Sequence, residues 1–183
     1  MRAWQVRFEE RRDPGSKGTK VQVFYEDVFR KLSEKKVRYV VVGGVALVLH
    51  GVVRLTADLD LLVEMGEANL RQFVEAMGEL GYKPKVPVKA EDFILSEKRR
   101  QWKEDKGMKV FSFYHRQRPM NLIDVLVEEP IPYEMVDRQK KILAARGIHI
   151  PVISVEHLKQ LKRIAGRPQD LADIEALEEL ERG

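Results

Sequence analysis

Hydrophobic and polar positions follow two different periods along the chain. Apolar side chains recur at three- and four-residue steps in residues 21–36 and 67–80, which predicts amphipathic helices there. Residues 37–42 are almost continuously apolar, which is typical of a strand buried on both faces. The same criteria predict a short helix at residues 45–49 and further strands at 58–63, 108–114 and 122–127.

The C-terminal third contains clear start and stop signals for its elements. Residues 140–144 and 148–153 are predicted to form a hairpin around Gly147. A helix is predicted from the N-cap Ser154 to residue 165, where Gly166 breaks it, and a second helix from Pro168 to residue 180. The charged residues 97–107 show no such pattern and are predicted to form a loop. Because strands and helices mix without regular alternation, we expect an α+β fold.

Length and composition predict a single compact domain. A chain of 183 residues with 44% hydrophobic residues is long enough for one buried core and short for two. We expect this domain to span residues 20–183, with a C-terminal helical portion at 154–183. Residues 1–19, which end in a cluster of turn-forming residues, are expected to be peripheral.

Charge and cysteine content narrow the classes of function. The net charge of +4 suits a polyanionic partner without requiring one. The absence of cysteine excludes a disulfide framework, a thiolate zinc site and a cysteine nucleophile. No apolar run has the length of a signal-peptide core or a membrane span, so we expect a soluble, cytoplasmic protein with no membrane partner.

Asp58 and Asp60 are predicted to share one face of a strand, because side chains alternate with a period of two. Like charges a few Å apart repel unless one acid is protonated or a cation lies between them. Mg²⁺ is the natural cation, since it prefers oxygen ligands and binds through carboxylates together with substrate phosphates. The alternative is a pair of strand-end acids that simply face water.

Asp124 is the third acid of interest because it interrupts an otherwise apolar strand. A buried charge needs a partner, and a position beside Asp58 and Asp60 would complete a site for two Mg²⁺ ions. The alternative is a salt bridge between Asp124 and one of the many arginines.

Gly43 and Gly44 follow a predicted buried strand and precede a short helix. Their backbone N–H groups could cradle a triphosphate, although a glycine pair taken alone is more typical of a tight strand-to-helix turn. The chain contains neither the Walker A pattern nor the dinucleotide-binding fingerprint.

The order of these residues resembles the first motif of the nucleotidyltransferase superfamily related to DNA polymerase β. The resemblance rests on Val42-Gly43-Gly44-Val45-Ala46, His50-Gly51, Arg54, Thr56 and Asp58-Leu59-Asp60-Leu61. The Arg and Thr before the acid pair are similar to those of the abortive-infection nucleotidyltransferase toxins of toxin–antitoxin systems. A second motif of that group is similar to residues 158–173, with Lys162, Arg167, Asp170 and Asp173.

The resemblance implies a nucleotidyltransferase fold, in which helices flank a mixed β-sheet and further helices lie at the C-terminus. It implies that Gly43 and Gly44 contact a nucleoside triphosphate, that Asp58 and Asp60 bind the metal, and that Asp124 is the third acid. Arg54, Thr56, Arg167 and Asp170 are counted with the nucleotide-binding residues. A cognate antitoxin protein is a further partner that the resemblance suggests.

Helical periodicity supports the second motif independently of the resemblance. Lys162 falls within the apolar stripe of its predicted helix, and Asp170 falls on the inward side of the next one. Lys162 could bind the triphosphate or assist proton removal, and Arg167 could neutralise phosphate charge. The alternative is a lysine that extends past the apolar face to water, with an Asp170 that only favours a helix N-terminus.

The remaining candidates carry less chemistry. The basic residues between Lys98 and Arg118, with Trp102 and Tyr114 interleaved, could bind an RNA backbone and stack a base, or could be an ordinary solvated surface. The four histidines (His50, His115, His149 and His157) lack a zinc-ligand spacing and are expected to be structural or surface residues.

The expected enzyme is therefore a nucleotidyltransferase in which an acceptor group attacks the α-phosphorus of a nucleoside triphosphate and pyrophosphate leaves. Asp124, or in second place Lys162, would help to deprotonate the acceptor. A tRNA or other RNA is the first choice of acceptor, and a small hydroxyl compound such as an antibiotic is the second. A non-catalytic relative that binds a nucleotide or a partner protein is the remaining alternative.

Overall fold

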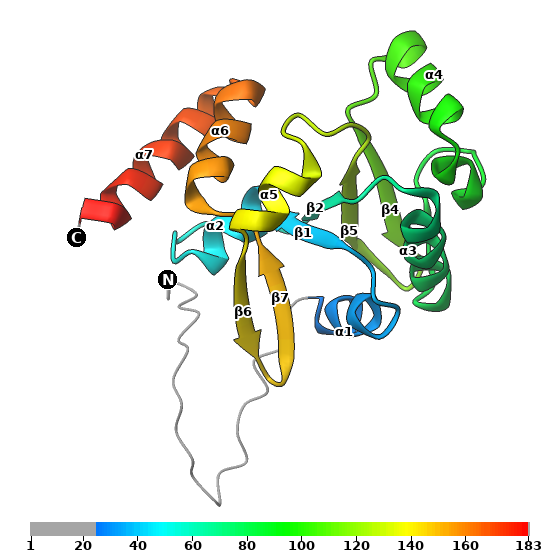
Figure 1. Cartoon of the computed structure of the whole chain (residues 1–183), viewed down its shortest axis with the longest axis horizontal. Helices are drawn as coiled ribbons and strands as arrows, with labels where there is room; N and C mark the ends of the chain where they lie inside the picture. Colours follow the sequence, from blue (N-terminus) through cyan, green and yellow to red (C-terminus); the bar gives the residue numbers. More distant parts are fainter. Residues whose placement is uncertain (1–24, 183) are drawn as a thin grey trace, which may run out of the picture.

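A computed structural model describes residues 25–182 and shows helices packed around one mixed β-sheet (Figure 1). The strands are β1 (Tyr39–Val42), β2 (Leu59–Val63), β3 (Tyr82–Pro84), β4 (Val110–His115), β5 (Arg118–Leu126), β6 (Lys141–Ala145) and β7 (Ile148–Val152). The helices are α1 (Glu26–Glu34), α2 (Gly43–Leu49), α3 (Glu67–Glu79), the 3₁₀ helix η1 (Ala90–Ile94), α4 (Ser96–Lys106), α5 (Tyr133–Gln139), α6 (Val155–Ala165) and α7 (Pro168–Arg182). None of these described helices is long and apolar enough to cross a lipid bilayer.

The sheet brings together strands that are far apart in the sequence. Its strand order is β3-β4-β5-β2-β1-β7-β6. β2 pairs antiparallel with β1 and parallel with β5, and in these pairings Asp60 lies opposite both Val42 and Asp124. The combination of parallel and antiparallel pairs confirms the predicted α+β class with a mixed sheet.

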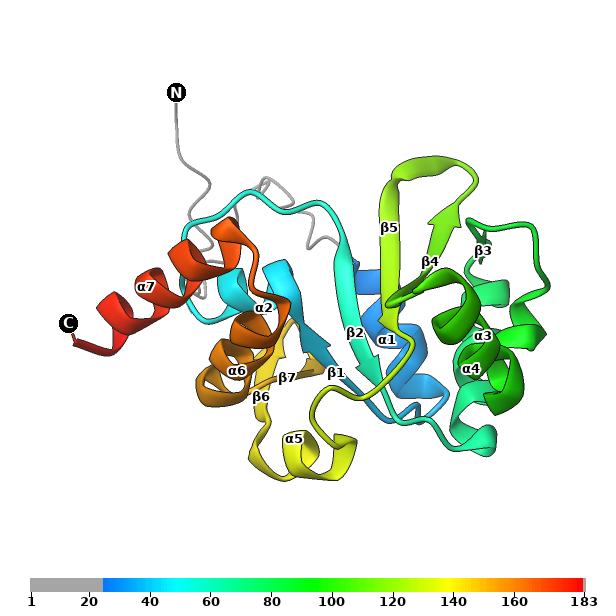
Figure 2. The same ribbon diagram turned by 90° about the horizontal axis from the view of Figure 1, so that it is seen from above.

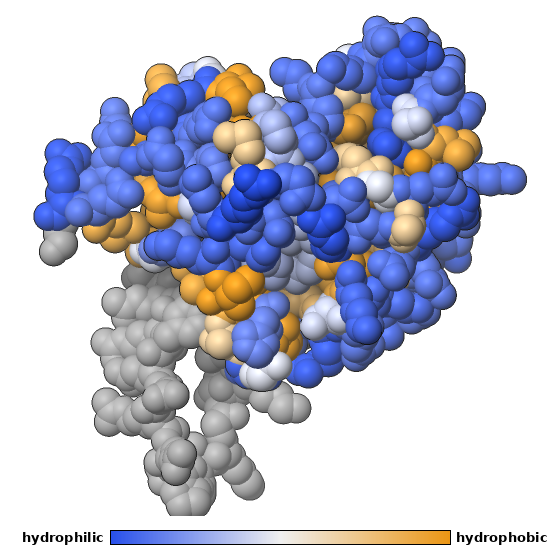
Figure 3. Space-filling view, in the orientation of Figure 1, coloured by the Kyte–Doolittle hydropathy of each residue, from blue (hydrophilic) through white to orange (hydrophobic). Residues whose placement is uncertain are grey.

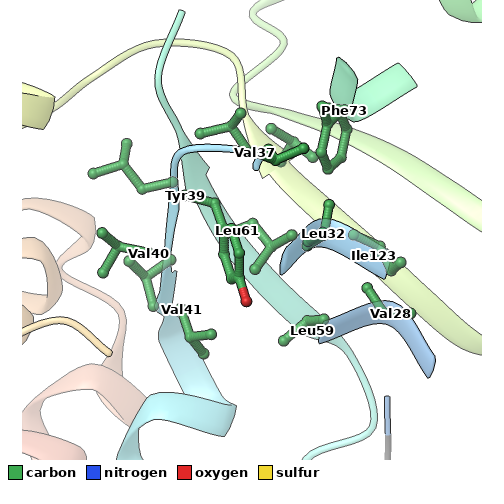
Figure 4. Packing of buried hydrophobic residues seen from close by; sticks show 14 of the residues in the cluster. Val28, Leu32, Val37, Tyr39, Val40, Val41, Leu59, Leu61, Phe73 and Ile123 are labelled. Atoms are coloured by element: carbon green, nitrogen blue, oxygen red, sulfur yellow. The ribbon is translucent and has the colours of Figure 1, made fainter. Parts of the chain in front are cut away.

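One face of the central strands packs against α1 and α3. Leu59 and Leu61 of β2 lie with Ile123 of β5 under α1, where all three side chains are completely buried (Figure 4). Because side chains alternate along a strand, Asp60 between the two leucines and Asp124 next to Ile123 point to the opposite face. The core therefore holds the strands in place from one side and leaves the acidic side chains on the other.

The predicted helix at 21–36 needs a correction at its start. Helix α1 begins at Glu26, and Tyr25 before it has a left-handed φ of 68°. Residues 21–24, like the predicted peripheral segment 1–19, lie outside the described residues. Because α-helical residues have negative φ, the helix does not continue through Tyr25.

The predicted loop at 97–107 is wrong, because these residues form helix α4. The indole of Trp102 stacks on the ring of Phe111, with 5.1 Å between ring centroids, and fixes an otherwise polar helix to the core. Arg99 is buried and donates hydrogen bonds of 2.7 Å to the carbonyls of Phe93 and Ile94. A single aromatic anchor and one buried arginine produce no apolar periodicity, so the pattern did not reveal the helix.

The C-terminal predictions are confirmed. β6 and β7 form the expected antiparallel hairpin. The Ser154 side chain accepts a hydrogen bond of 3.3 Å from the backbone N–H of His157, as an N-cap does. Gly166 ends α6 with φ 64°, and α7 starts at Pro168. Helix α5 and strand β3 were not expected from the sequence.

Candidate active site

Three of the predicted acids lie together on the face of the sheet opposite α1. Asp60 of β2 and Asp124 of β5 are register partners, and Asp58 immediately precedes β2. The pKa of Asp60 is raised from its usual 3.8 to about 6, chiefly by burial, with smaller contributions from the charges of Asp124 and Asp58 and an opposing one from the Gly44 hydrogen bond. The pKa of Asp58 is raised by burial and then by Asp124. The acids therefore lie close enough to repel one another.

Asp124 has a buried carboxylate oxygen, Oδ1, that no hydrogen bond satisfies among the described residues. Within residues 25–182, Asp124 takes no part in an ion pair with an arginine. A buried carboxylate oxygen without a partner is costly unless a ligand or cation completes it.

The carboxylates have the donor type that Mg²⁺ prefers, but they do not form a closed cage. No group of three or more His, Asp or Glu side chains among residues 25–182 is arranged to hold a metal ion by itself. Mg²⁺ usually binds through one or two carboxylates together with phosphate oxygens of a substrate. The donor set and the unpartnered oxygen of Asp124 therefore fit an ion that binds together with a triphosphate.

The glycine pair is required because the chain passes very close to the acids. Gly43 has φ 63°, and a Cβ at this position would overlap with the carboxylate of Asp60. A Cβ on Gly44 would lie 2.5 Å from Oγ1 of the exposed Thr56. The backbone N–H of Gly44 donates a hydrogen bond of 3.3 Å to Asp60 Oδ2. The two glycines therefore leave room for the side chains of Asp60 and Thr56 and also allow the turn. They form the first residues of α2 instead of preceding it.

A cluster of charged side chains from α6, α7 and the loop before β2 lies beside the acids. Lys162 donates hydrogen bonds to Asp173 Oδ2 at 2.6 Å and to Asp170 Oδ1 at 3.2 Å. Arg54 pairs with Asp173, and Arg167 pairs with Asp170 through a bond of 2.8 Å from Nε. Lys162, Asp170 and Asp173 are all buried, as the helical periodicity predicted.

The electrostatics connect this charged cluster with the carboxylates. Although burial acts to raise the pKa of Asp170, hydrogen bonds from Arg167 and Lys162 lower it to about 2. The charge of Lys162 also opposes the rise in the pKa of Asp60, which places the ammonium within reach of the acid site. Lys162 is already a donor to two carboxylates, so the arrangement favours a positioning and charge-balancing role over proton removal. Arg54 retains a buried Nε without a hydrogen-bond partner, next to the same site.

Tyr25 is a residue of this region that the sequence analysis missed. Its hydroxyl lies 2.5 Å from the carbonyl oxygen of Ala57 and 2.9 Å from that of Leu122. Ala57 precedes Asp58, and Leu122 lies two positions before Asp124, so one side chain links the segments that carry both acids. The apolar periodicity counted Tyr25 as one more core residue, and no local signal distinguishes a tyrosine that bridges two strands.

Replacing Tyr25 by Phe is expected to lower kcat for nucleotidyl transfer by about 10- to 100-fold with little change in nucleotide affinity, since small displacements of reacting groups are costly. Loss of the hydrogen bonds should reduce the free energy of unfolding by about 1 kcal/mol. The measurements are transfer kinetics and urea unfolding. Tyr133→Phe is the matched control, because its hydroxyl bonds Asp137 away from the acids. An unchanged kcat in the Tyr25 variant would remove the positioning role.

The other sequence candidates occupy different places. Trp102 is buried and cannot stack a base, whereas Tyr114 is partly exposed. His50 Nε2 lies 2.7 Å from the carbonyl oxygen of Ile153, and His115 Nδ1 accepts hydrogen bonds from two backbone N–H groups of the turn that follows it. These contacts agree with structural roles for both histidines.

Comparison with known proteins found a family model that matches this chain and solved structures of similar fold. A family model described as "Nucleotidyltransferase of unknown function (DUF6036)" matches residues 24–181. A search of curated proteins found no match.

Solved structures of similar fold include three nucleotidyltransferase-type proteins. The lincosamide antibiotic adenylyltransferase LnuA, bound to lincomycin, aligns with a TM-score of 0.55 and 16% identity, covering 88% of this chain and 98% of that one. An antigenic nucleotidyltransferase-like protein from Paracoccidioides brasiliensis aligns with a TM-score of 0.52 and 15% identity, over 82% and 71% of the two chains. ANT(2'')-Ia in complex with adenylyl-2''-tobramycin aligns with a TM-score of 0.52 and 13% identity, over 85% and 89%. At these identities the similarity shows the fold alone.

Proposed function

Since this chain belongs to the family described as "Nucleotidyltransferase of unknown function (DUF6036)", we propose that it transfers a nucleoside monophosphate from a nucleoside triphosphate to a hydroxyl group of an RNA, most simply a tRNA. The proposal rests on the position of Asp58, Asp60 and Asp124, which lie together next to the glycine pair, where a Cβ would overlap with neighbouring side chains. Family membership supports an enzyme of the nucleotidyltransferase class; the acceptor and the site roles are the proposal.

The triphosphate would bind on the β1 side of the acids. Gly43 and Gly44 leave the backbone open to a phosphate group there, and Thr56 stands next to them. Arg167 is about three-quarters exposed (73%) although it pairs with Asp170, so its guanidinium can also reach phosphate oxygens. Arg54 and Asp170 would act through the charged cluster that holds this side of the site in place.

Asp58, Asp60 and Asp124 would hold Mg²⁺, with two ions in the complete site. Bound Mg²⁺ would supply positive charge next to the phosphate and acceptor oxygens. The raised pKa of Asp60 agrees with this assignment, because a carboxylate that is costly to ionise alone gains most from a cation. Nucleotidyl transfer should therefore depend on Mg²⁺.

The reaction would follow in-line displacement. The acceptor oxygen forms a bond to the α-phosphorus, the bond from the α-phosphorus to the bridging oxygen breaks, and pyrophosphate leaves. Asp124 would take the proton of the acceptor hydroxyl, because its buried Oδ1 has no hydrogen-bond partner of its own. Lys162 is the second choice for this step, since it is paired with two carboxylates.

The small-molecule acceptor remains the alternative within the same reaction class. LnuA and ANT(2'')-Ia are named for antibiotic substrates, but their identities of 16% and 13% to this chain do not favour an antibiotic here. The resemblance to abortive-infection toxins would add a cognate antitoxin, whose co-expression should relieve any growth arrest that the enzyme causes.

The decisive experiment is incubation of the purified protein with Mg²⁺, total RNA and each α-labelled nucleoside triphosphate, followed by gel electrophoresis. A labelled band of tRNA size that disappears on removal of Mg²⁺ is the expected result. Label on a small hydroxyl compound but not on RNA would overturn the RNA acceptor. Nucleotide binding without label transfer to any acceptor would point to a non-catalytic relative.

A further inference from the structure

The face of the sheet that carries the acids continues over two more strands. Asp124 of β5 lies opposite Ser112 of β4, and Tyr114 of β4 lies opposite Lys83 of β3. The backbone N–H of Lys85, just after β3, donates to the carbonyl of Ser112 at 2.9 Å. Because cross-strand partners share a face, the side chains of Ser112, Tyr114 and Lys83 project on the same side as Asp124.

Burial along β4 shows that this continuation is open. Phe111 and Phe113 are buried on the helix-covered face, where Phe113 meets Phe73 of α3 edge to face. Ser112 and Tyr114, which alternate with these phenylalanines, are partly exposed, and Lys83 and Lys85 are exposed. The open face therefore leads from the acids to a basic edge of the sheet, at a distance of about 10 Å for two strand spacings.

The opposite side of the acids is occupied. Helices α6 and α7 lie on the β1 side of β2, whereas β4, α3 and α4 lie on its other side (Figure 2). Lys162 and the glycine pair already approach Asp60 from the β1 side. In-line displacement needs the attacking and leaving groups on opposite sides of the phosphorus. A triphosphate on the β1 side thus leaves the β4 and β3 side for the acceptor.

The chemistry of that side fits a polyanion with flat bases. The backbone of Lys85 bonds Ser112, and Ser112 is the register partner of Asp124, so the basic edge lies one strand away from the strand that carries this acid. Lys83 and Lys85 supply positive charge for phosphates, Tyr114 offers an aromatic ring, and Ser112 offers a hydroxyl. A polycationic small molecule would meet repulsion from both lysines.

We propose that Lys83, Lys85, Ser112 and Tyr114, here termed the acceptor strip, bind the single-stranded end of an RNA acceptor and direct its terminal hydroxyl towards Asp124. The lysines contact two backbone phosphates and the Tyr114 ring stacks on a base. This inference rests on the proposed function, and it moves RNA contact away from the basic helix α4. That helix is anchored through Trp102 to Phe111, on the helix-covered face.

The face seen in Figure 3 is mostly hydrophilic, with apolar residues in small separate patches. Positive charge is spread over several elements, so charge alone does not select one of them. The acceptor strip differs from α4 because its cations, its aromatic ring and the acids share one face of the sheet.

The test measures RNA binding without nucleotide, in full-length protein that carries Asp60→Asn to prevent turnover. Fluorescence anisotropy with a labelled tRNA is recorded as a function of salt. Lys83→Gln together with Lys85→Gln is expected to weaken binding about 10-fold and to reduce the slope of log K against log salt by about two. Tyr114→Ala should weaken binding by about 5- to 100-fold, and Tyr114→Phe should restore it.

Lys98→Gln together with Lys106→Gln on α4 is the matched control, since both lysines are exposed and the charge change is identical. This pair is expected to change affinity less than about 2-fold. Equal losses from both pairs, or a Tyr114→Ala variant with full affinity, would overturn the acceptor strip.

The labelling experiment separates failure of the inference from failure of the proposed function. Labelled RNA that forms equally well with the acceptor-strip variants would reject the strip and leave the transferase activity in place. RNA that binds through the strip but is never labelled would reject the transfer and leave the binding site in place.

Discussion

Replacing Asp60 by Asn should abolish nucleotidyl transfer and, without metal, make the protein more stable at neutral pH. The amide can still accept the Gly44 hydrogen bond, so the local backbone is retained. It has no charged oxygen with which to bind a cation, so the rate of nucleotidyl transfer should fall about a thousand-fold or more. The measurement is label transfer from an α-labelled triphosphate in the variant and in the unchanged protein.

The gain in stability follows from the sign of the pKa shift. The pKa of Asp60 rises from 3.8 to about 6 on folding, so the folded protein binds this proton more tightly than the unfolded chain does. Stability therefore increases as pH falls from about 6 towards 4, and above pH 6 the ionised carboxylate destabilises the fold. Allowing for partial exposure, Asn should add about 1 to 3 kcal/mol at pH 7.5.

Thermal unfolding over a series of pH values tests this. The advantage of the Asn variant should shrink below pH 6, and Mg²⁺ with nucleotide should raise the Tm of the unchanged protein only. Asp105→Asn on the exposed face of α4 is the control and should alter neither stability nor transfer. Retained transfer in the Asp60 variant would reject the metal assignment, and an unchanged Tm would reject the crowding of acids.

Replacing Lys162 by Met is expected to cost about 3 to 5 kcal/mol of unfolding free energy, because two buried carboxylates lose a shared partner. Methionine fills a similar volume, so the loss reports on charge and not on a cavity. Urea unfolding at pH 7.5 measures it.

The controls for Lys162 lie on the same helix pair. Arg163→Met, on the exposed side of α6, should change stability by less than about 0.5 kcal/mol. Adding Asp170→Asn to the Lys162 variant should recover part of the loss, since it removes one buried carboxylate whose remaining partner, Arg167, is exposed. A cost below about 1 kcal/mol for Lys162→Met would show that the charged cluster does not hold α6 and α7 together.

Local pattern was sufficient for those elements whose own residues carry the signal. The two-residue period predicted Asp58 and Asp60 on one face, and the buried side chains of Leu59 and Leu61 occupy the other. Ser154 and Gly166 marked the ends of α6 because capping depends on neighbouring backbone groups only. The inward positions of Lys162 and Asp170 followed from helical geometry in the same way.

Local pattern failed where a long-range contact decides the conformation. Helix α4 depends on the contact between Trp102 and Phe111, and its own residues show no apolar face. The Tyr25 hydroxyl contacts carbonyl groups 32 and 97 positions away, and its role in joining two strands follows from these contacts alone. No window of neighbouring residues contains either contact.

The amino-acid pattern was enough to predict the helices and strands with strong periods and the position of Asp58 and Asp60 on one strand face. The packed fold was needed to show that Asp124 lies opposite Asp60, that Lys162 bonds Asp170 and Asp173, that Gly43 must lack a Cβ beside Asp60, and that Lys85 bonds the strand next to Asp124. The physical reason is that strand register and helix docking are chosen by the burial of the whole core. The partners of a charged side chain are therefore known only once distant segments have packed.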